Sequence, residues 1–268
     1  MLKTILQGMA VGITETVPGV SGSTVAMILG VYERLIGSIN ALTSSHRKNA
    51  IPFLIVFGIG MVGGFAVSIL VISYFLTNFR TPTLMLFAGI IVGFLPFIWK
   101  ETVRFANKKL QSKHYLIMTA ALVLVAATQF LVGTDLTGAN LSIGDYLFLF
   151  FAGFIASTAL VLPGISGALI LTILGVYELA THSLKSFDMP IVLTIGAGVI
   201  LGVLLTSKLV HYLLEHYISE TYAAMVGLIT GSIFAIFASL EGGFTTATIM
   251  ASIVTFIAGF MLMLRLNR

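Results

Sequence analysis

The sequence contains no cysteine and few charged residues. Without cysteine the chain cannot form disulfides or thiolate metal sites, and it cannot use a cysteine nucleophile. Charged residues make up 9% of the 268 residues, whereas soluble domains carry about 25%. This shortage of charge excludes an ordinary soluble domain.

Apolar residues take up most of the remaining sequence. Hydrophobic residues make up 58% of the chain, and the mean hydropathy is +1.08. The 27 glycines and 20 phenylalanines are typical of helices that pack through small residues in lipid. The composition predicts an all-α polytopic membrane protein. Its net charge of +4 is explained by basic cytoplasmic loops, so the bilayer is the expected partner and nucleic acid is not.

One interrupted apolar segment occurs twice in the chain. It reads TETVPGVSGSTVAMILGVYERLI at 14–36 and ALVLPGISGALILTILGVYEL at 159–179. A shift of 145 places Pro163 on Pro18, and ten of the sixteen positions from Pro18 to Glu33 are then identical. PGxSG followed at one distance by GVYE indicates an internal duplication.

The Pro-Gly pair predicts a broken helix in each copy. Proline removes a backbone donor and glycine frees the backbone, so the short segment 4–14 and the longer segment 20–39 are expected as two half-helices. Together they predict a re-entrant hairpin over 4–39. The second hairpin is expected over 146–180, with a longer first arm.

The other hydrophobic runs predict three membrane spans in each half of a single membrane domain. A shift of 138 aligns glycines of the first two spans of each half, whereas the last spans match too weakly to support an alignment. The expected first repeat, 1–133, has spans at 51–77, 83–99 and 115–133, and the second, 146–265, has spans at 191–216, 222–238 and 246–264.

The number of crossings predicts that the two repeats insert with opposite orientation. A unit with three spans and a hairpin crosses an odd number of times, so its copy is inverted. With the loop 100–113 in the cytoplasm, five basic residues there and six elsewhere lie inside, and only Arg80 and Lys185 lie outside. The positive-inside rule supports this orientation, with both termini cytoplasmic.

The two hairpin tips supply the candidate substrate site. Inverted repeats with broken helices are typical of transporters that bind substrate near the membrane midplane. Hydroxyls and free backbone amides at a helix start attract anions, although glycine breaks also occur only to let helices cross. The tip residues expected to bind substrate are Glu15, Pro18, Gly19, Ser21, Gly22, Ser23, Thr24, Pro163, Gly164, Ser166 and Gly167.

Other ionisable residues are candidates for phosphate contact or coupling. Arg34 follows the first GVYE and is expected to meet a phosphate near the inner face. Lys208, His211 and Glu215 share one helix face, either as an interfacial triad or as coupling residues. Glu15 is expected to exchange protons during transport, or else to cap the neighbouring helix.

The quoted motifs resemble the paired signature of the polyprenyl-phosphate transporters, bacterial membrane proteins long catalogued as a domain of unknown function. The resemblance covers nearly the whole chain. It implies that undecaprenyl phosphate moves from the outer to the inner leaflet of the plasma membrane for reuse, without catalysis, metal or cofactor. The family pattern usually has Asp at the position of Glu15, and Gly-Gly at the position of Gly22-Ser23.

Two other functions remain open. GITETVPGVSGST also resembles the tip of the membrane undecaprenyl-pyrophosphate phosphatases, but Val11 stands at the place of their second Glu, no His follows Thr24, and Gly167 replaces their Arg. Phosphoryl hydrolysis needs such acid, base and cationic groups. The third hypothesis is that the protein is an ion-coupled transporter of a small anion. The sequence leaves the oligomeric state open, a homo-oligomer included.

Overall fold

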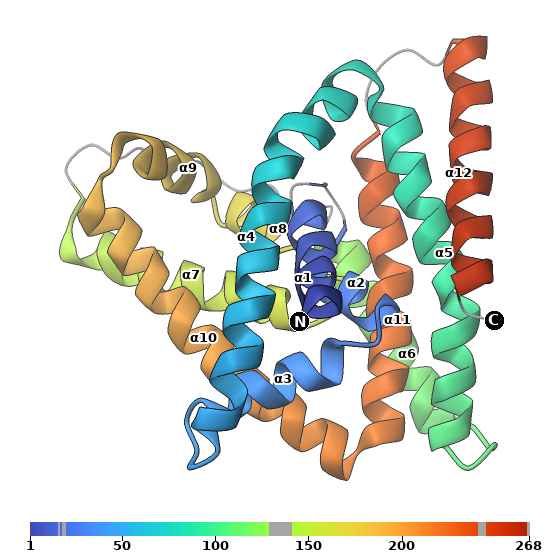
Figure 1. Ribbon diagram of the computed structural model, residues 1–268, viewed down its shortest axis with the longest axis horizontal. Coiled ribbons are helices and arrows are strands. Elements are labelled where there is room, and N and C mark those ends of the chain that lie inside the picture. Colours follow the sequence, from blue (N-terminus) through green and yellow to red (C-terminus); the bar gives the residue numbers. More distant parts are fainter. Residues whose placement is uncertain (16, 18–19, 129–140, 241–244, 267–268) are drawn as a thin grey trace.

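The structure is a computed structural model that describes residues 1–268 except 16, 18–19, 129–140, 241–244 and 267–268 (Figure 1). The described residues form twelve helices and no strand. The helices are α1 (Leu2–Thr14), α2 (Gly22–Ile28), α3 (Tyr32–Ala41), α4 (Arg47–Asn78), α5 (Arg80–Phe105), α6 (Ser112–Thr128), α7 (Ile143–Val161), α8 (Gly167–Ile173), α9 (Tyr177–Ser186), α10 (Met189–His216), α11 (Ile218–Ala238) and α12 (Thr246–Leu266).

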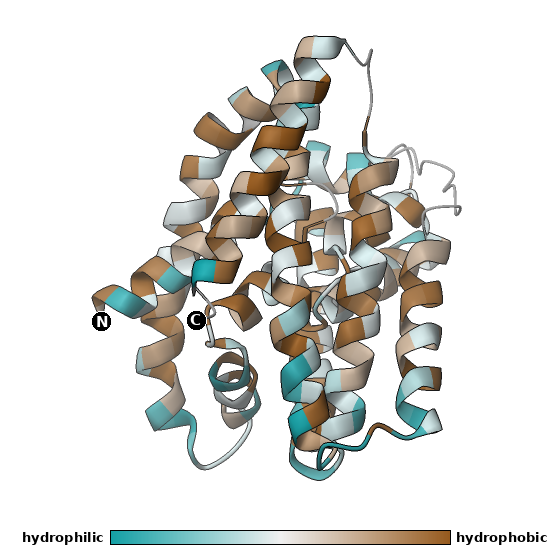
Figure 2. Ribbon diagram, turned by 90° about the vertical axis from the view of Figure 1, so that its right-hand side faces the viewer, coloured by the Kyte–Doolittle hydropathy of each residue, from teal (hydrophilic) through white to brown (hydrophobic). Residues whose placement is uncertain are grey.

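The long helices identify a multi-pass membrane protein. Within the described residues, α4, α5, α7, α10, α11 and α12 are long and apolar enough to span a bilayer. Large apolar side chains face outward, such as Val62 of α4 and Leu193 of α10. Figure 2 shows apolar residues along the long helices, with hydrophilic residues mostly near helix ends and loops. The prediction of an all-α polytopic membrane protein is confirmed.

The segment 20–39, expected as one longer half-helix, contains a second break. Helix α2 ends before Gly30, which has a positive φ of 64°, and α3 starts at Tyr32. The N–H of Gly30 bonds to the Met27 carbonyl and the N–H of Val31 bonds to the Ala26 carbonyl. This pair of bonds is a Schellman cap, which glycine favours because it adopts positive φ without strain.

The second copy ends its short helix in the same way. Gly175 has a φ of 67°, and the N–H groups of Gly175 and Val176 cap α8 with the same pair of bonds. Helices α8 and α9 meet there at 114°. The single-break description was wrong because the apolar run continues through Gly30 and hides the turn. The repeated GVYE marks this second break.

Four helix pairs form the main packing contacts. Helix α1 packs on α4 as α7 packs on α10, and α5 packs on α12 as α6 packs on α11. Close approach at glycine recurs in each pair, because a Cβ at Gly60 would overlap the Ile5 carbonyl and a Cβ at Gly198 would overlap the Phe150 carbonyl. The offsets are 198 − 60 = 138 and 150 − 5 = 145, the two shifts found in the sequence.

The same glycine contacts relate the last helix of each half. A Cβ at Gly89 would overlap the Phe256 carbonyl of α12, and a Cβ at Gly227 would overlap the Met118 carbonyl of α6. Both offsets are 138, since 227 − 89 and 256 − 118 agree. Helices α6 and α12 therefore occupy equivalent positions, although their sequences match weakly. Each packs on a helix of the other half, so the halves are interleaved.

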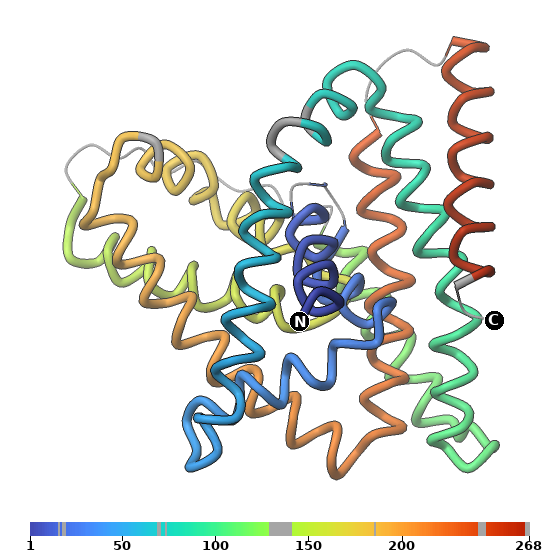
Figure 3. Tube along the Cα trace, in the orientation of Figure 1, coloured from blue at the N-terminus to red at the C-terminus, as the bar shows by residue number. Residues whose placement is uncertain are grey.

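The equivalent helices α4 and α10 run in opposite directions. In Figure 3, α4 rises from the bottom of the view to the top, whereas α10 descends from the upper left to the bottom. Helix α3 lies near the lower end of α4 and α9 near the upper end of α10 (Figure 1). The connection at 106–111 lies at the lower end. The expected extension of the third span to residue 133 lies outside the described residues.

Candidate functional site

The two tips meet in the interior of the molecule. In the first, α1 ends at Thr14, and α2 starts after the extended residue Ser21. In the second, α7 ends at Val161 and α8 starts after the extended residue Ser166. Pro18 and Gly19 lie outside the described residues. Pro163 and Gly164 form the second turn, where Gly164 has a φ of 88° and lies against the Leu228 backbone.

Hydroxyl groups of the first tip bind backbone groups of the second. The Ser23 hydroxyl donates to the Leu162 carbonyl at 2.9 Å, and the Gly164 N–H donates to the Thr24 hydroxyl at 2.9 Å. The Ser23 hydroxyl also lies 2.7 Å from that of Ser21. All three hydroxyl-bearing residues are buried. Ser23 and Thr24, expected as anion ligands, therefore connect the two tips in this conformation.

A tyrosine adds a further connection that sequence reasoning did not select. The Tyr32 hydroxyl donates to the Val161 carbonyl at 2.9 Å, and Tyr32 is only 3% exposed. Tyr32 belongs to the repeated GVYE, so the duplicated motif was the available signal. Its equivalent, Tyr177, is 41% exposed. The tyrosines of the two copies therefore have different environments.

The polar contacts of the two tips are asymmetric. A shift of 145 relates Ser23 to Ala168 and Thr24 to Leu169, which carry no hydroxyl. The second copy therefore lacks the hydroxyls that would form the equivalents of the Ser23 and Thr24 bonds. Its backbone carbonyls and N–H group serve instead as partners.

The Glu15 carboxylate lies over the start of α2. It accepts a hydrogen bond from the Gly22 N–H, and a Cβ at Gly22 would overlap its Oε1 atom. In the second tip the equivalent neighbours are Leu160 and Gly167, with a Cβ at Gly167 lying 3.4 Å from the Leu160 side chain. One tip thus presents a carboxylate where the other presents an apolar group.

The remaining candidates lie on other helices. Arg34 is exposed on α3, with its guanidinium 4.2 Å from the centroid of the Phe53 ring. On α10, His211 lies 3.2 Å from the Glu215 carboxylate, while Lys208 is exposed. The pair His211–Glu215 is formed as the helical spacing indicates. Their role and that of Arg34 stay predictions.

A polar cluster near the lower ends of α6 and α11 was also not predicted from the sequence. Lys113 of α6 pairs with Glu220 of α11, and the Tyr222 hydroxyl of α11 donates to the Glu33 carboxylate of α3 at 2.7 Å. The Tyr222 ring packs 4.8 Å from that of Phe105. Each residue has the sequence context of an ordinary helix-end side chain, so only the fold reveals their proximity.

We expect Tyr32→Phe to destabilise the protein. The change removes the hydroxyl that satisfies the Val161 carbonyl, and an unsatisfied buried polar group costs about 1–3 kcal/mol. The measurement is the thermal unfolding midpoint in detergent. Tyr177→Phe is the matched control and should change stability by no more than about 0.5 kcal/mol, because Tyr177 is exposed. Equal destabilisation by the two changes would contradict the assigned difference between the tips.

These features define a multi-pass helical membrane protein with two broken-helix motifs whose polar tips meet inside the protein. A family model described as VCA0040-like, undecaprenyl phosphate translocase-like, matches residues 11–252, and the chain belongs to this family.

Two relatives carry the name polyprenyl-phosphate transporter. The protein from Staphylococcus aureus (strain NCTC 8325 / PS 47) is 34% identical over 277 aligned residues, covering 98% of this chain and 95% of the relative. The protein from Vibrio cholerae serotype O1 (strain ATCC 39315 / El Tor Inaba N16961) is 31% identical over 247, covering 87% of this chain and 76% of the relative. No solved structure matches the chain.

Proposed function

We propose that this protein transports a polyprenyl phosphate across the bacterial plasma membrane, from the outer to the inner leaflet, for reuse of the carrier lipid. Family membership and the names of both relatives support the substrate class. The observation within the molecule that carries the proposal is the meeting of two polar tips inside a bundle of apolar helices. Broken helices of this kind form substrate sites in transporters.

In this proposal the lipid phosphate binds at the first tip, where it accepts hydrogen bonds from the Ser21 and Ser23 hydroxyls and from the Gly22 N–H. In the described conformation Glu15 occupies that N–H and the hydroxyls bind each other and the Leu162 carbonyl. The phosphate therefore competes with Glu15 for one donor. An ionised Glu15 disfavours the phosphate by repulsion, and a neutral Glu15 favours it. Proton exchange at Glu15 is thus proposed to couple to loading and release.

The tips are better suited to binding than to hydrolysis. Glu15 is the only ionisable residue in the segments 14–24 and 161–169. Cleavage of a pyrophosphate needs groups that neutralise charge and transfer protons at the phosphoryl group. These segments supply one carboxylate and several hydroxyls, but no basic residue. This composition favours a carrier that leaves its substrate chemically unchanged over a phosphatase.

We expect the purified protein to bind undecaprenyl phosphate and to release no inorganic phosphate from undecaprenyl pyrophosphate. The measurement is a phosphate-release assay in detergent, with binding followed in parallel. Heat-denatured protein gives the background. Phosphate released in proportion to native protein would assign the tips to an enzyme.

The opposite directions of α4 and α10 support the proposed inverted repeat. We place the connection 106–111 and both termini in the cytoplasm, since this arrangement puts most basic residues inside. The α9–α10 connection then lies outside.

We expect a single cysteine at Asp188 to react with an impermeant thiol reagent in intact cells, and one at Lys109 to react only after permeabilisation. The chain has no native cysteine, so each variant carries one reactive thiol. Both positions are exposed. The extent of labelling is measured by a mass shift. Equal labelling of the two variants in intact cells would contradict the proposed orientation.

A further inference from the structure

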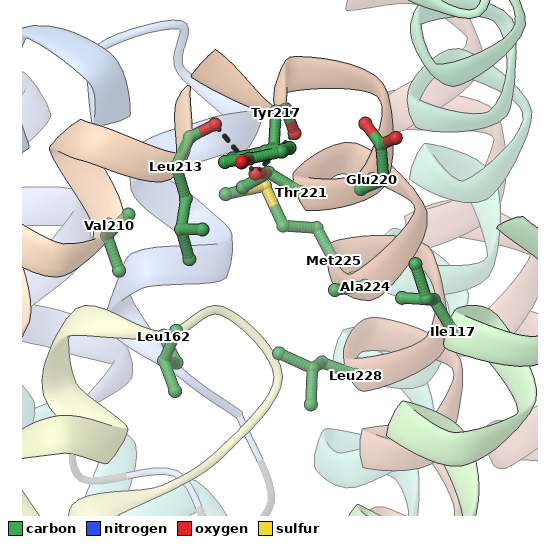
Figure 4. Close-up of a pocket in the computed structure, with 10 residues that line it drawn as sticks. All are labelled: Ile117, Leu162, Val210, Leu213, Tyr217, Glu220, Thr221, Ala224, Met225 and Leu228. Carbon is green, nitrogen blue, oxygen red and sulfur yellow. Dashed lines mark hydrogen bonds between the residues drawn. The ribbon is translucent and has the colours of Figure 1, made fainter. Parts of the chain in front are cut away.

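An apolar cavity lies beside the second tip (Figure 4). Its volume is about 390 Å³, at the small end of the range of ~300–1,000 Å³ typical of ligand sites. The cavity is formed by α6, α10, α11 and the turn after α7. Its lining is mainly aliphatic, with Tyr217, Glu220 and Thr221 contributed by the start of α11 and the residue before it.

Leu162 joins this cavity to the polar tips. Its side chain lines the cavity, whereas its carbonyl accepts the hydrogen bond from Ser23. Leu228 lines the cavity too, and its backbone lies against Gly164 of the same turn. In Figure 4, Leu162 and Leu228 face the cavity across from Leu213. An apolar space and a hydroxyl cluster thus share one wall.

Side-chain sizes in the lining of this cavity differ between the two halves. A shift of 138 relates Leu213, Ala224 and Met225 to Phe75, Leu86 and Phe87. Every one of these lining positions has a larger side chain in the first half. At other lining positions the first half has the smaller side chain, since Val17, Phe79 and Pro82 stand where the cavity has Leu162, Tyr217 and Glu220. The lining has therefore diverged between the two copies in both directions.

We propose that this cavity binds the isoprene units nearest the phosphate of the transported lipid. The proposal rests on the proposed function, and it adds a site for the apolar part of the substrate. A polyprenyl phosphate joins an anionic group directly to an apolar chain, and the hydroxyl cluster and the cavity present the matching pair of surfaces. The small volume admits only the first few units, so the rest of the chain lies outside the cavity.

Chemical protection tests the occupancy of the cavity. Ala224→Cys places the single thiol of the chain in the cavity wall, and Ala238→Cys places it on the exposed end of the same helix. Farnesyl phosphate should slow alkylation at position 224 at least about tenfold, equivalent to ~1.4 kcal/mol, and leave position 238 unchanged. Inorganic phosphate should protect neither position. Unchanged alkylation at 224 with farnesyl phosphate bound would overturn the proposal.

A space-filling variant tests the same site by affinity. Ala224→Trp should weaken farnesyl phosphate binding at least about tenfold, whereas Ala238→Trp should bind as the unaltered protein does. Wild-type affinity in Ala224→Trp would overturn the cavity assignment alone. Absence of prenyl phosphate binding to the unaltered protein would overturn the proposed function as well. Equal protection of position 224 by phosphatidic acid would assign the cavity to a bilayer lipid and overturn the prenyl assignment.

Discussion

Replacing Ser21 and Ser23 together by alanine should weaken lipid phosphate binding at least about tenfold, and should reduce transport in proportion. Both hydroxyls are buried at the first tip, 2.7 Å apart, and Ser23 also binds the Leu162 carbonyl. In the proposed bound state both hydroxyls leave their present partners and donate to the phosphate. The double change removes both of these donors. Binding of undecaprenyl phosphate to purified protein measures the loss.

Ser166→Ala is the matched control for this double change. Ser166 occupies the position of Ser21 in the second copy, where Ser23 is replaced by Ala168. We expect a much smaller loss from Ser166→Ala, because this tip lacks the paired hydroxyls. Thermal unfolding of each variant separates loss of binding from loss of fold. Equal losses of affinity in folded variants would contradict an asymmetric site.

Glu15→Gln should keep lipid binding and remove the dependence of transport on a pH gradient. The uncharged amide can still accept the Gly22 N–H, but it cannot exchange a proton or repel the phosphate. Transport in proteoliposomes, with and without an imposed pH gradient, measures the response. The direction follows from charge: protonation of Glu15 favours loading, and deprotonation favours release.

Glu15→Asp is the control that keeps the carboxylate. Glu15→Asp should therefore retain a pH response. Glu15→Leu removes the carboxylate and makes the first tip resemble the second, where Leu160 stands at the equivalent position. If Glu15→Gln transports at the unaltered rate with the unaltered pH response, this residue does not couple proton movement to transport. A role as an electrostatic cap of α2 would then remain for Glu15.

The duplicated motif predicted where the two polar tips would form, because Pro-Gly breaks interrupt an apolar run visibly. It did not reveal the turn at Gly30, since the flanking residues are apolar and Schellman geometry depends on backbone bonds. The partners of the first-tip side chains were also hidden. Tyr32 and Val161 are 129 residues apart in sequence, and a side chain bonded to a distant backbone carbonyl leaves no pattern.

The equivalence of the last span in each half was also not predictable from the sequence. Helices α6 and α12 have diverged in sequence, yet the glycines facing them, Gly227 and Gly89, have not. At such a contact the glycine cannot be replaced, because any Cβ would overlap the facing backbone. The facing residue can vary, because it contributes only its backbone carbonyl to the contact. Equivalence of these helices is therefore visible in the contacts, and not in their own sequences. The cavity beside Leu162 likewise depends on side-chain volumes at positions brought together only by folding.

Leaflet exchange in proteoliposomes tests the central claim most directly. Purified protein is reconstituted into liposomes that carry labelled undecaprenyl phosphate in one leaflet, and the phosphate exposed on the other side is followed in time. We expect the protein to accelerate exchange over protein-free liposomes, and Ser21→Ala/Ser23→Ala to lose most of this acceleration. Exchange at the protein-free rate, by protein shown to be folded and to span the membrane, would contradict transport of the lipid by this chain.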